Sequence, residues 1–452
     1  GFTWNEKGDK AVFAVYSQDN TDRWIVVFDA KSNSYKMVDR QRDEAWIAGP
    51  GINWYANVLD WIDNDRLYFQ SEKTGYSHLY IHDLKANRTT ALTSGDYEVQ
   101  KVDLALDKKH FYIQANLDHP GITHYYKLKI ESKELTQLTH EKGGNRVWLS
   151  PDEKWLAILH STSTTPWELY VKKNSPKSIA QKLTKSTSDA FDAYNWQEPD
   201  MITFTNRNNK IIHARVFTPE KQHESRPAVV FVHGAGYLQN VHYWWSQYYR
   251  EYMFHNLLTD LGYTVIDIDY TASSGYGRDI RTGIYRHMGG ADLTDQVDGV
   301  QYLVENYNVN PENVGIYGGS YGGFISLMAL FTEQEVFAAG AGLRSVTDWA
   351  HYNHGYTSNI LNQPYDDPIA YERSSPINFA DGLEGALLMC HGMIDVNVQF
   401  QDIVRLSQRL IELEKDNWEL AVYPLEDHGF VHTTSWIDEY KRILKLFENN
   451  LK

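Results

Sequence analysis

One serine in this chain lies in a setting that can make it a nucleophile. Ser320 is the centre of Gly318–Gly322, whose sequence GGSYG fits the pattern G-x-S-x-G. A buried strand is predicted directly before it over Val314–Tyr317, and a helix after it over Phe324–Phe331. The flanking glycines permit the strained strand-to-helix turn that lifts a serine hydroxyl above a sheet. This setting predicts a nucleophilic serine, with an ordinary glycine-rich turn as the alternative.

A serine hydroxyl needs a base to take its proton and an acid to orient that base. In this arrangement the acid and then the histidine follow the serine along the chain. Asp395 follows a predicted strand over Ala386–Cys390, and His428 follows one over Leu420–Tyr423. Open α/β sheets carry their sites at these carboxyl ends of strands. We therefore predict Ser320 as nucleophile, Asp395 as orienting acid and His428 as general base.

Three nearby residues compete for the same roles. Glu426 and Asp427 adjoin His428 in the sequence, but a direct neighbour cannot easily reach back to the ring nitrogen. His391 precedes Asp395 and lies closer to the predicted strand, so we expect a structural role for it.

The reaction also needs donors for the oxyanion that forms on the attacked carbonyl. One is the backbone N–H of Tyr321, the residue after the nucleophile. The second is expected from the loop that begins at His233, with the sequence HGAG, after a predicted strand over Ala228–Val232. The His233 imidazole can add a donor in the right protonation state or tautomer. The alternative is that His233 is only a turn residue.

These residues belong to a second half of the chain in which strands and helices alternate. A further strand is predicted over Val265–Tyr270, and further helices over Gln296–Val304, Ile403–Leu413 and Ile437–Phe447. Such alternation is typical of a mostly parallel sheet with helices on both faces.

The first half of the chain repeats at intervals of about 45 residues. Leu92-Thr93, Leu138-Thr139 and Leu183-Thr184 recur at spacings of 46 and 45, and short β-rich runs lie between them. A repeat of this length with several strands is typical of a β-propeller blade. Four copies are visible, which predicts a partial propeller of about four blades; a β-sandwich with accidental spacing is the alternative.

Composition excludes several classes of function. Lys and Arg total 43 against 59 Asp and Glu, a net charge of −16, which argues against nucleic-acid binding and adsorption to anionic membranes. No apolar run is long enough to span a bilayer. The single cysteine, Cys390, excludes an intrachain disulfide, and no metal or cofactor is expected. Because the chain begins with Gly1 and not with Met, we expect a processed protein or a piece of a longer one.

Three stretches together carry a family resemblance. Gly318–Gly323 (GGSYGG), Asp395–Val398 (DVNV) and Glu426–Gly429 (EDHG) resemble the prolyl oligopeptidase family of serine peptidases, with its dipeptidyl-peptidase branch the most similar. The resemblance implies a β-propeller and an α/β-hydrolase catalytic domain. The pattern changes near the Ser/Thr-rich stretch Thr184–Ser188, so we expect the propeller over residues 1–194 and the catalytic domain over residues 195–452. It also implies short peptide substrates, cleavage after proline or alanine through an acyl-enzyme, and a homodimer as one oligomeric state. It favours the bacterial periplasm or secretion, with the cytoplasm as the alternative.

The same resemblance implies an aromatic pocket for the proline ring. Rigid aromatic walls bury such a ring at little entropic cost. The alternative is that these side chains form the buried face of a helix. The pocket would consist of Val346, Trp349, Tyr352, Tyr356, Asn397 and Val398, with Tyr321 beside them.

Two departures from the family pattern leave the specificity open. The dipeptidyl branch holds the substrate's amino terminus with a pair of glutamates, and no convincing Glu-Glu pair occurs before residue 195. The branch also usually carries a tyrosine where this chain has His233. A histidine at this position resembles the acylaminoacyl peptidases of the family more than the dipeptidyl branch. An acylaminoacyl peptidase or esterase with the same triad is therefore one alternative. A non-catalytic protein whose propeller binds a partner is the other.

Overall fold

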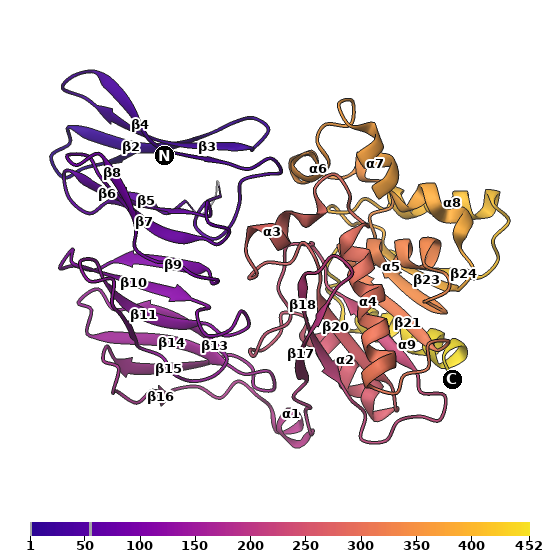
Figure 1. Ribbon diagram of the computed structural model, residues 1–452. Helices are drawn as coiled ribbons and strands as arrows, with labels where there is room; N and C mark the ends of the chain where they lie inside the picture. Colours follow the sequence, from indigo (N-terminus) through magenta and orange to yellow (C-terminus); the bar gives the residue numbers. More distant parts are fainter. Residues whose placement is uncertain (1, 54–56) are drawn as a thin grey trace. The chain divides into compact units, whose positions relative to one another are not determined.

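The computed structural model describes residues 2–53 and 57–452 (Figure 1). The contacts of the chain divide it into two compact units. The first unit runs to Asn195 and includes the short segments 242–245 and 274–282, and the second comprises the rest of the chain to Lys452. Every residue that the sequence marks for catalysis or for the pocket belongs to the second unit.

Four sheets, each of four antiparallel strands in chain order, make up the first unit within its described residues. The first sheet contains β1 (Thr3–Trp4), β2 (Lys10–Tyr16), β3 (Asp22–Asp29) and β4 (Ser34–Arg42). The second contains β5 (Leu59–Trp61), β6 (Arg66–Ser71), β7 (His78–Asp83) and β8 (Arg88–Ala91). The third contains β9 (Val99–Leu104), β10 (His110–Ala115), β11 (His124–Lys129) and β12 (Leu135–Gln137). The fourth contains β13 (Gly144–Leu149), β14 (Trp155–Ser161), β15 (Glu168–Lys173) and β16 (Gln181–Lys182), and α1 (Asp189–Ala193) follows it.

The recurring Leu-Thr pairs have a structural reason. Each pair follows the last strand of a sheet and extends its pairing with the third strand. In the second sheet the Leu92 N–H donates to the Leu79 carbonyl at 2.8 Å, and the Thr93 hydroxyl accepts from the Leu79 N–H at 3.0 Å. Leu138-Thr139 bonds to Tyr125 in the same way, and Leu183-Thr184 to Leu169. The threonine hydroxyl thus satisfies a backbone donor that the short last strand leaves open.

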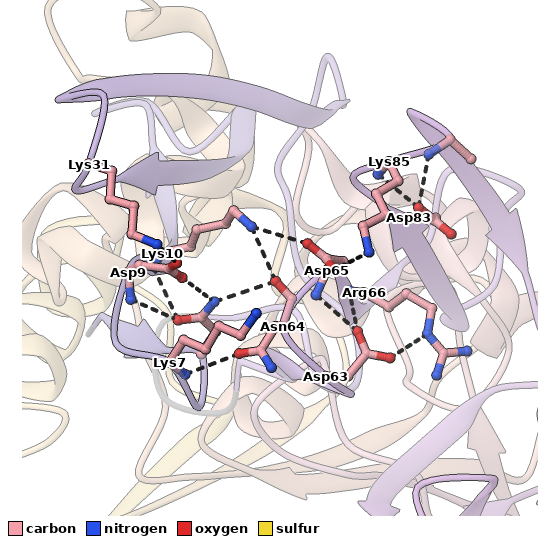
Figure 2. Close-up of polar contacts among 12 residues, drawn as sticks. Lys7, Asp9, Lys10, Lys31, Asp63, Asn64, Asp65, Arg66, Asp83 and Lys85 are labelled. Carbon is pink, nitrogen blue, oxygen red and sulfur yellow. Dashed lines mark hydrogen bonds and ion pairs between the residues drawn. The ribbon is translucent and has the colours of Figure 1, made fainter.

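Polar side chains connect the first two sheets at their turns (Figure 2). The Lys10 ammonium lies 3.1 Å from one carboxylate oxygen of Asp65, and the Lys85 ammonium lies 2.7 Å from the other. The Asn64 side chain accepts from the Lys7 N–H at 3.0 Å. The turn between β5 and β6 is therefore bound by residues of the β1–β2 hairpin and of the β7–β8 hairpin.

Segment 274–282, which includes α3 (Arg278–Arg281), is fixed to the first unit by a buried ion pair. Arg281 donates two hydrogen bonds to Glu72, at 2.9 and 2.7 Å. Burial raises the pKa of the nearby Glu98 carboxyl to about 7, against the attraction of Arg281. Paired charges of this kind are costly to separate, so this segment is strongly attached.

A single eight-stranded sheet carries the second unit, in the order β17-β18-β20-β19-β21-β22-β23-β24. The pairs from β20 onward are parallel, whereas β17 and β18 are antiparallel to their neighbours. The mostly parallel sheet expected from the alternating pattern is therefore present. Its strands are β17 (Asp200–Thr205), β18 (Ile211–Phe217), β19 (Ala228–Val232), β20 (Thr264–Asp269), β21 (Val314–Gly319), β22 (Ala339–Leu343), β23 (Ala386–Gly392) and β24 (Trp418–Tyr423).

Helices pack on this sheet and on one another. Tyr440 of α9 (Thr433–Asn450) donates to Glu251 of α2 (Tyr249–Asp260) at 3.0 Å. Tyr321 of α5 (Tyr321–Thr332) donates to Asp292 of α4 (Ala291–Asn306) at 2.6 Å. None of the helices in the described part of the chain is long and apolar enough to cross a membrane. The α-helices of this unit are α2 (Tyr249–Asp260), α4 (Ala291–Asn306), α5 (Tyr321–Thr332), α6 (His354–Leu361), α7 (Pro368–Ser374), α8 (Gln401–Glu412) and α9 (Thr433–Asn450).

Candidate active site

Ser320 occupies a sharp turn between β21 and α5. Its φ of 61° and ψ of −116° lie in a region that non-glycine residues avoid, so the backbone is strained at this residue. A Cβ on Gly322 would lie 2.0 Å from the Val232 carbonyl oxygen, and one on Gly318 would lie 2.4 Å from the same atom. Only glycine permits this close approach of the turn to the end of β19. The turn presents a half-buried Ser320 at the carboxyl end of the sheet.

Asp395 and His428 form a directed hydrogen bond. The His428 Nδ1–H donates to Asp395 Oδ2 at 2.7 Å, while Oδ1 accepts from the N–H groups of Asn397 and Val398, both at 2.8 Å. Because a carboxylate only accepts, Nδ1 carries a proton, and in the neutral ring Nε2 then has the lone pair. Burial alone would raise the pKa of Asp395, but hydrogen bonds from His391 and His428 hold that pKa well below its usual value. The carboxylate is therefore ionised and fixes the ring.

The rival residues have other partners. Asp427 Oδ1 accepts from the N–H groups of Val396 and His428, at 3.0 and 2.7 Å, and so joins the two loops. Glu426 is buried and binds His432 Nδ1 at 2.7 Å. His391 is buried behind Asp395, and its Nε2 donates mainly to the Val398 carbonyl at 2.9 Å while lying 3.4 Å from Asp395 Oδ2. None of these three lines the pocket described next.

A cavity of about 320 Å³ opens at Ser320. It brings together eight of the residues that the sequence singled out. Asp395 and Val398 lie behind it, because Val398 is fully buried and binds Asp395 through its N–H. The cavity is lined by Gly234, Ala235, Tyr237, Tyr248, Gly319, Ser320, Tyr321, Arg344, Val346, Trp349, Tyr352, Tyr356, Asn397, His428 and Gly429.

One wall of this cavity is a fixed set of aromatic rings. The Trp349 ring, in a short 3-10 helix over Trp349–His351, lies 5.5 Å from Tyr352 and 6.0 Å from Tyr356 between centroids. The Tyr352 hydroxyl donates to Asn397 Oδ1 at 2.7 Å, and the Tyr356 hydroxyl donates to the Ala235 carbonyl at 3.1 Å. Ring packing and hydrogen bonds therefore hold the wall in place before any ligand arrives.

Tyr321 begins α5, where backbone N–H groups have no partner within the helix. Its hydroxyl donates to buried Asp292 at 2.6 Å. Burial raises the pKa of Asp292 to about 6, partly offset by that hydrogen bond. The Tyr321 side chain is thus locked in place, which fixes the direction of the first helical N–H groups.

The His233 ring lies outside the set of residues that line the cavity. It is fully buried, with Nε2 3.0 Å from Ser273 Oγ and the ring stacked on Tyr270 at 4.3 Å. Burial lowers the pKa of His233 to about 4, so the ring is neutral at pH 7. The structure therefore does not bring this imidazole to Ser320.

Sequence reasoning missed three residues of the cavity, Tyr237, Tyr248 and Arg344. The Tyr248 hydroxyl accepts from the Gly234 N–H at 2.7 Å. A Cβ on Gly234 would lie 2.8 Å from that hydroxyl and 3.6 Å from Ser320 Cβ, so the hydroxyl and the serine flank the same glycine. Tyr248 lies in an aromatic-rich loop without a recognisable pattern, and Arg344 follows a glycine-rich strand, so neither gave a sequence signal.

Two family models match the chain in separate regions. The model of the prolyl oligopeptidase family matches residues 249–452, which include Ser320, Asp395 and His428. The model of the dipeptidyl peptidase IV N-terminal region matches residues 2–167. Residues 249–452 belong to the prolyl oligopeptidase family. The resemblance read from the GGSYGG, DVNV and EDHG sequences is thereby confirmed.

Individual members of the family resemble the chain along most of its length. Human dipeptidyl peptidase 8 is 27% identical, covering 80% of this chain and 44% of the relative. Dipeptidyl peptidase 4 of Trichophyton rubrum is 24% identical, covering 98% of this chain and 58% of the relative. The crystal structure of Porphyromonas gingivalis dipeptidyl peptidase 4 shares the fold, with a TM-score of 0.87 at 21% identity, covering all of this chain and 63% of that one. The chain spans about half the length of the curated relatives it matches.

Proposed function

We propose that the second unit is a serine peptidase that cleaves short peptides through an acyl-enzyme on Ser320. The observation that carries this proposal is the 2.7 Å hydrogen bond from His428 to Asp395, with His428 and Ser320 lining one cavity. Membership of the prolyl oligopeptidase family and relatives named as dipeptidyl peptidases support a peptide substrate.

The reaction follows from the proton on His428 Nδ1. Nε2 accepts the Ser320 proton as Oγ attacks the carbonyl carbon of the scissile bond. The tetrahedral intermediate then collapses, the C–N bond breaks, and His428 gives that proton to the leaving amine. Water next adds to the acyl carbon with His428 as base, which releases the acid product and restores the Ser320 hydroxyl. The ionised Asp395 stabilises the imidazolium formed in each step.

The oxyanion in this proposal is held by the Tyr321 N–H and the Tyr248 hydroxyl. Burial raises the pKa of Tyr248, so its hydroxyl keeps its proton at neutral pH. Its oxygen already accepts from the Gly234 N–H, which leaves the O–H free to donate to the substrate. A donor fixed in this way needs no reorientation during the reaction.

The Tyr248→Phe variant should lower kcat by about 10²- to 10³-fold with little change in KM, because an oxyanion donor acts mainly in the transition state. Steady-state hydrolysis of an Ala-Pro anilide measures both constants. Tyr249→Phe, next in the chain but outside the cavity, is the matched control. A kcat for Tyr248→Phe within threefold of the control would remove Tyr248 from the oxyanion site.

The aromatic wall is the proposed subsite for the residue before the scissile bond. Val346, Trp349, Tyr352 and Tyr356 offer apolar faces that fit a proline or alanine side chain, and Asn397 fixes Tyr352 at the rim. Val398 supports this subsite from behind. This arrangement favours peptides with proline or alanine at that position.

We also propose that the four antiparallel sheets of the first unit are consecutive blades of a β-propeller, ending near residue 194, and that residues 195–452 form an α/β-hydrolase domain. Each sheet has the four-stranded order of a blade, and the match to the dipeptidyl peptidase IV N-terminal region supports this interpretation.

Three substrates separate the proposal from its alternatives: two anilides with the same leaving group, and one short-chain ester. We expect kcat/KM for an Ala-Pro anilide to exceed that for an N-acetyl-alanyl anilide by at least about tenfold, since only the former places a proline ring against the aromatic wall. A higher kcat/KM for the N-acetyl substrate would indicate an acylaminoacyl peptidase. A preference of several orders of magnitude for a short-chain ester would indicate an esterase, and no turnover of any substrate would favour a binding role.

A further inference from the structure

Arg344 is a permanent positive charge in the wall of the cavity. It follows β22 with a φ of 44°, and its N–H donates to the Cys390 carbonyl at 2.7 Å. The residue is only 9% exposed, yet its side chain lines the cavity beside Ser320. No step of the reaction proposed above uses this guanidinium.

The guanidinium occupies the space that a side chain at residue 319 would need. A Cβ on Gly319 would lie 2.9 Å from Arg344 Nη2 and 3.1 Å from Nε. Glycine before the nucleophile is therefore what lets a cation lie directly against the Ser320 turn. This close approach connects the GGS sequence with Arg344.

Ring contacts place Arg344 on the His428 side of the cavity. Its Cζ lies 5.8 Å from the Phe430 ring centroid and 5.2 Å from that of Trp436. Phe430 follows His428 by two residues and packs on Trp436. The guanidinium therefore packs against rings that follow His428 in the chain, whereas the aromatic wall around Trp349 is the proposed subsite for the residue before the scissile bond.

Within the part of the chain that the structure describes, the Arg344 guanidinium has no hydrogen-bonded counterion. The nearest carboxylate oxygen, on buried Glu439, lies 4.0 Å from Nη1, which exceeds hydrogen-bond length, and Nη1 has no hydrogen-bond partner among the described residues. Burial raises the pKa of Glu439 to about 7 and also raises the pKa of nearby Glu251, so burial opposes the ionised form of both carboxyls. A buried cation without an acceptor is costly, and a ligand carboxylate would relieve that cost.

We propose that Arg344 binds a carboxylate on the residue that leaves, so that the enzyme favours substrates with a carboxylate directly after the scissile bond. The inference rests on the proposed peptidase function and names a substrate class for it. In a tripeptide the α-carboxyl carbon of the leaving residue is two bonds from the amine that His428 protonates. A guanidinium matches a carboxylate with two parallel hydrogen bonds, which a neutral amide cannot accept.

The carboxylate can come from the chain end or from an acidic side chain, and three peptides distinguish these sources. Ala-Pro-Ala carries a free α-carboxylate, Ala-Pro-Ala-amide carries none, and Ala-Pro-Asp-amide carries only the side-chain carboxylate. A charged hydrogen bond should raise kcat/KM for a carboxylate peptide by about tenfold over the plain amide. Which of the two carboxylate peptides shows this gain identifies the source.

The Arg344→Gln variant tests the assignment through the ratio of these rates. We expect the carboxylate-to-amide ratio to fall from about tenfold to within twofold, because glutamine lacks the charge. Arg250→Gln is the matched control: its guanidinium also lies over Trp436, at 4.5 Å, but outside the cavity, so the ratio should persist. A ratio that is the same in wild type, Arg344→Gln and Arg250→Gln would overturn the proposal.

A second variant distinguishes carboxylate binding by Arg344 from a purely structural role of this residue. Glu439→Gln removes the nearest competing carboxylate and should raise the carboxylate-to-amide ratio by about twofold or more, since Arg344 would then interact more strongly with the ligand. A packing role for Arg344 and Glu439 would instead lower all three rates together in both variants. Labelling of Ser320 by a fluorophosphonate gives the fraction of folded enzyme in each sample. If the wild type is labelled and cleaves Ala-Pro-Ala-amide as fast as Ala-Pro-Ala and Ala-Pro-Asp-amide, the carboxylate proposal alone is wrong. If the wild type cleaves no peptide, the peptidase proposal is wrong.

Discussion

Replacing Ser320 with alanine should lower kcat for an Ala-Pro anilide by roughly 10⁵- to 10⁶-fold, because the variant has no oxygen to form the acyl-enzyme. Removal of the nucleophile in a triad costs about as much as removal of the whole triad. Hydrolysis of the anilide and covalent labelling by a fluorophosphonate measure the two parts of this prediction. Both signals should disappear together.

The control for this prediction is Ser358→Ala, on α6 and outside the residues that line the cavity. It should label and hydrolyse like the wild type. Labelling that persists in Ser320→Ala would show that another residue reacts with the fluorophosphonate. Loss of hydrolysis with full labelling would be equally damaging, since it would separate the reactive serine from the catalytic one.

The pairing of Asp395 with His428 could be predicted because neighbouring parallel strands end at the same edge of a sheet. β23 and β24 pair in register from Leu387–Trp418 to Gly392–Tyr423, so the loops after them lie side by side. Asp395 and His428 occupy those two loops. Chain order and strand position were therefore enough to expect their hydrogen bond, whereas its atoms and length came only from the structure.

Elements without an apolar pattern escaped prediction. β22 has the sequence AGAGL, which does not predict a strand. α5 packs against this strand so closely that a Cβ on Gly340 would lie 3.0 Å from Leu330 Cδ1. α2 buries Glu251, His255 and Asn256, so its buried face is partly polar and shows no helical apolar periodicity. In both cases tertiary packing, and not local preference, decides the structure.

The second oxyanion donor that we propose, Tyr248, shows a different limit of sequence reasoning. The loop after β19 could be located from the HGAG sequence, but the direction of its side chains could not. His233 turns toward Ser273 and Tyr270, while Tyr248, fifteen residues later, brings its hydroxyl to Gly234. Which side chain of a loop reaches the cavity depends on the packing beneath it.

Replacing Asp395 with asparagine should lower kcat by about 10⁴-fold without unfolding the protein, because the variant would hold His428 in the wrong tautomer. Oδ1 of Asp395 accepts two backbone N–H groups, from Asn397 and Val398. The amide oxygen of an asparagine must keep those bonds, which turns its NH₂ group toward His428 Nδ1. Nδ1 must then accept, the ring proton moves to Nε2, and Nε2 can no longer take the proton of Ser320.

Asp427→Asn is the matched control for this variant, and it should keep kcat within about threefold of the wild type. Asp427 Oδ1 also accepts two backbone N–H groups, from Val396 and His428, and an asparagine oxygen at that position can keep both. The two variants make the same chemical change in adjoining loops, but only Asp395 contacts the imidazole. Comparable kcat/KM values for the two on an Ala-Pro anilide, with circular dichroism spectra like that of the wild type, would show that the tautomer of His428 does not depend on Asp395.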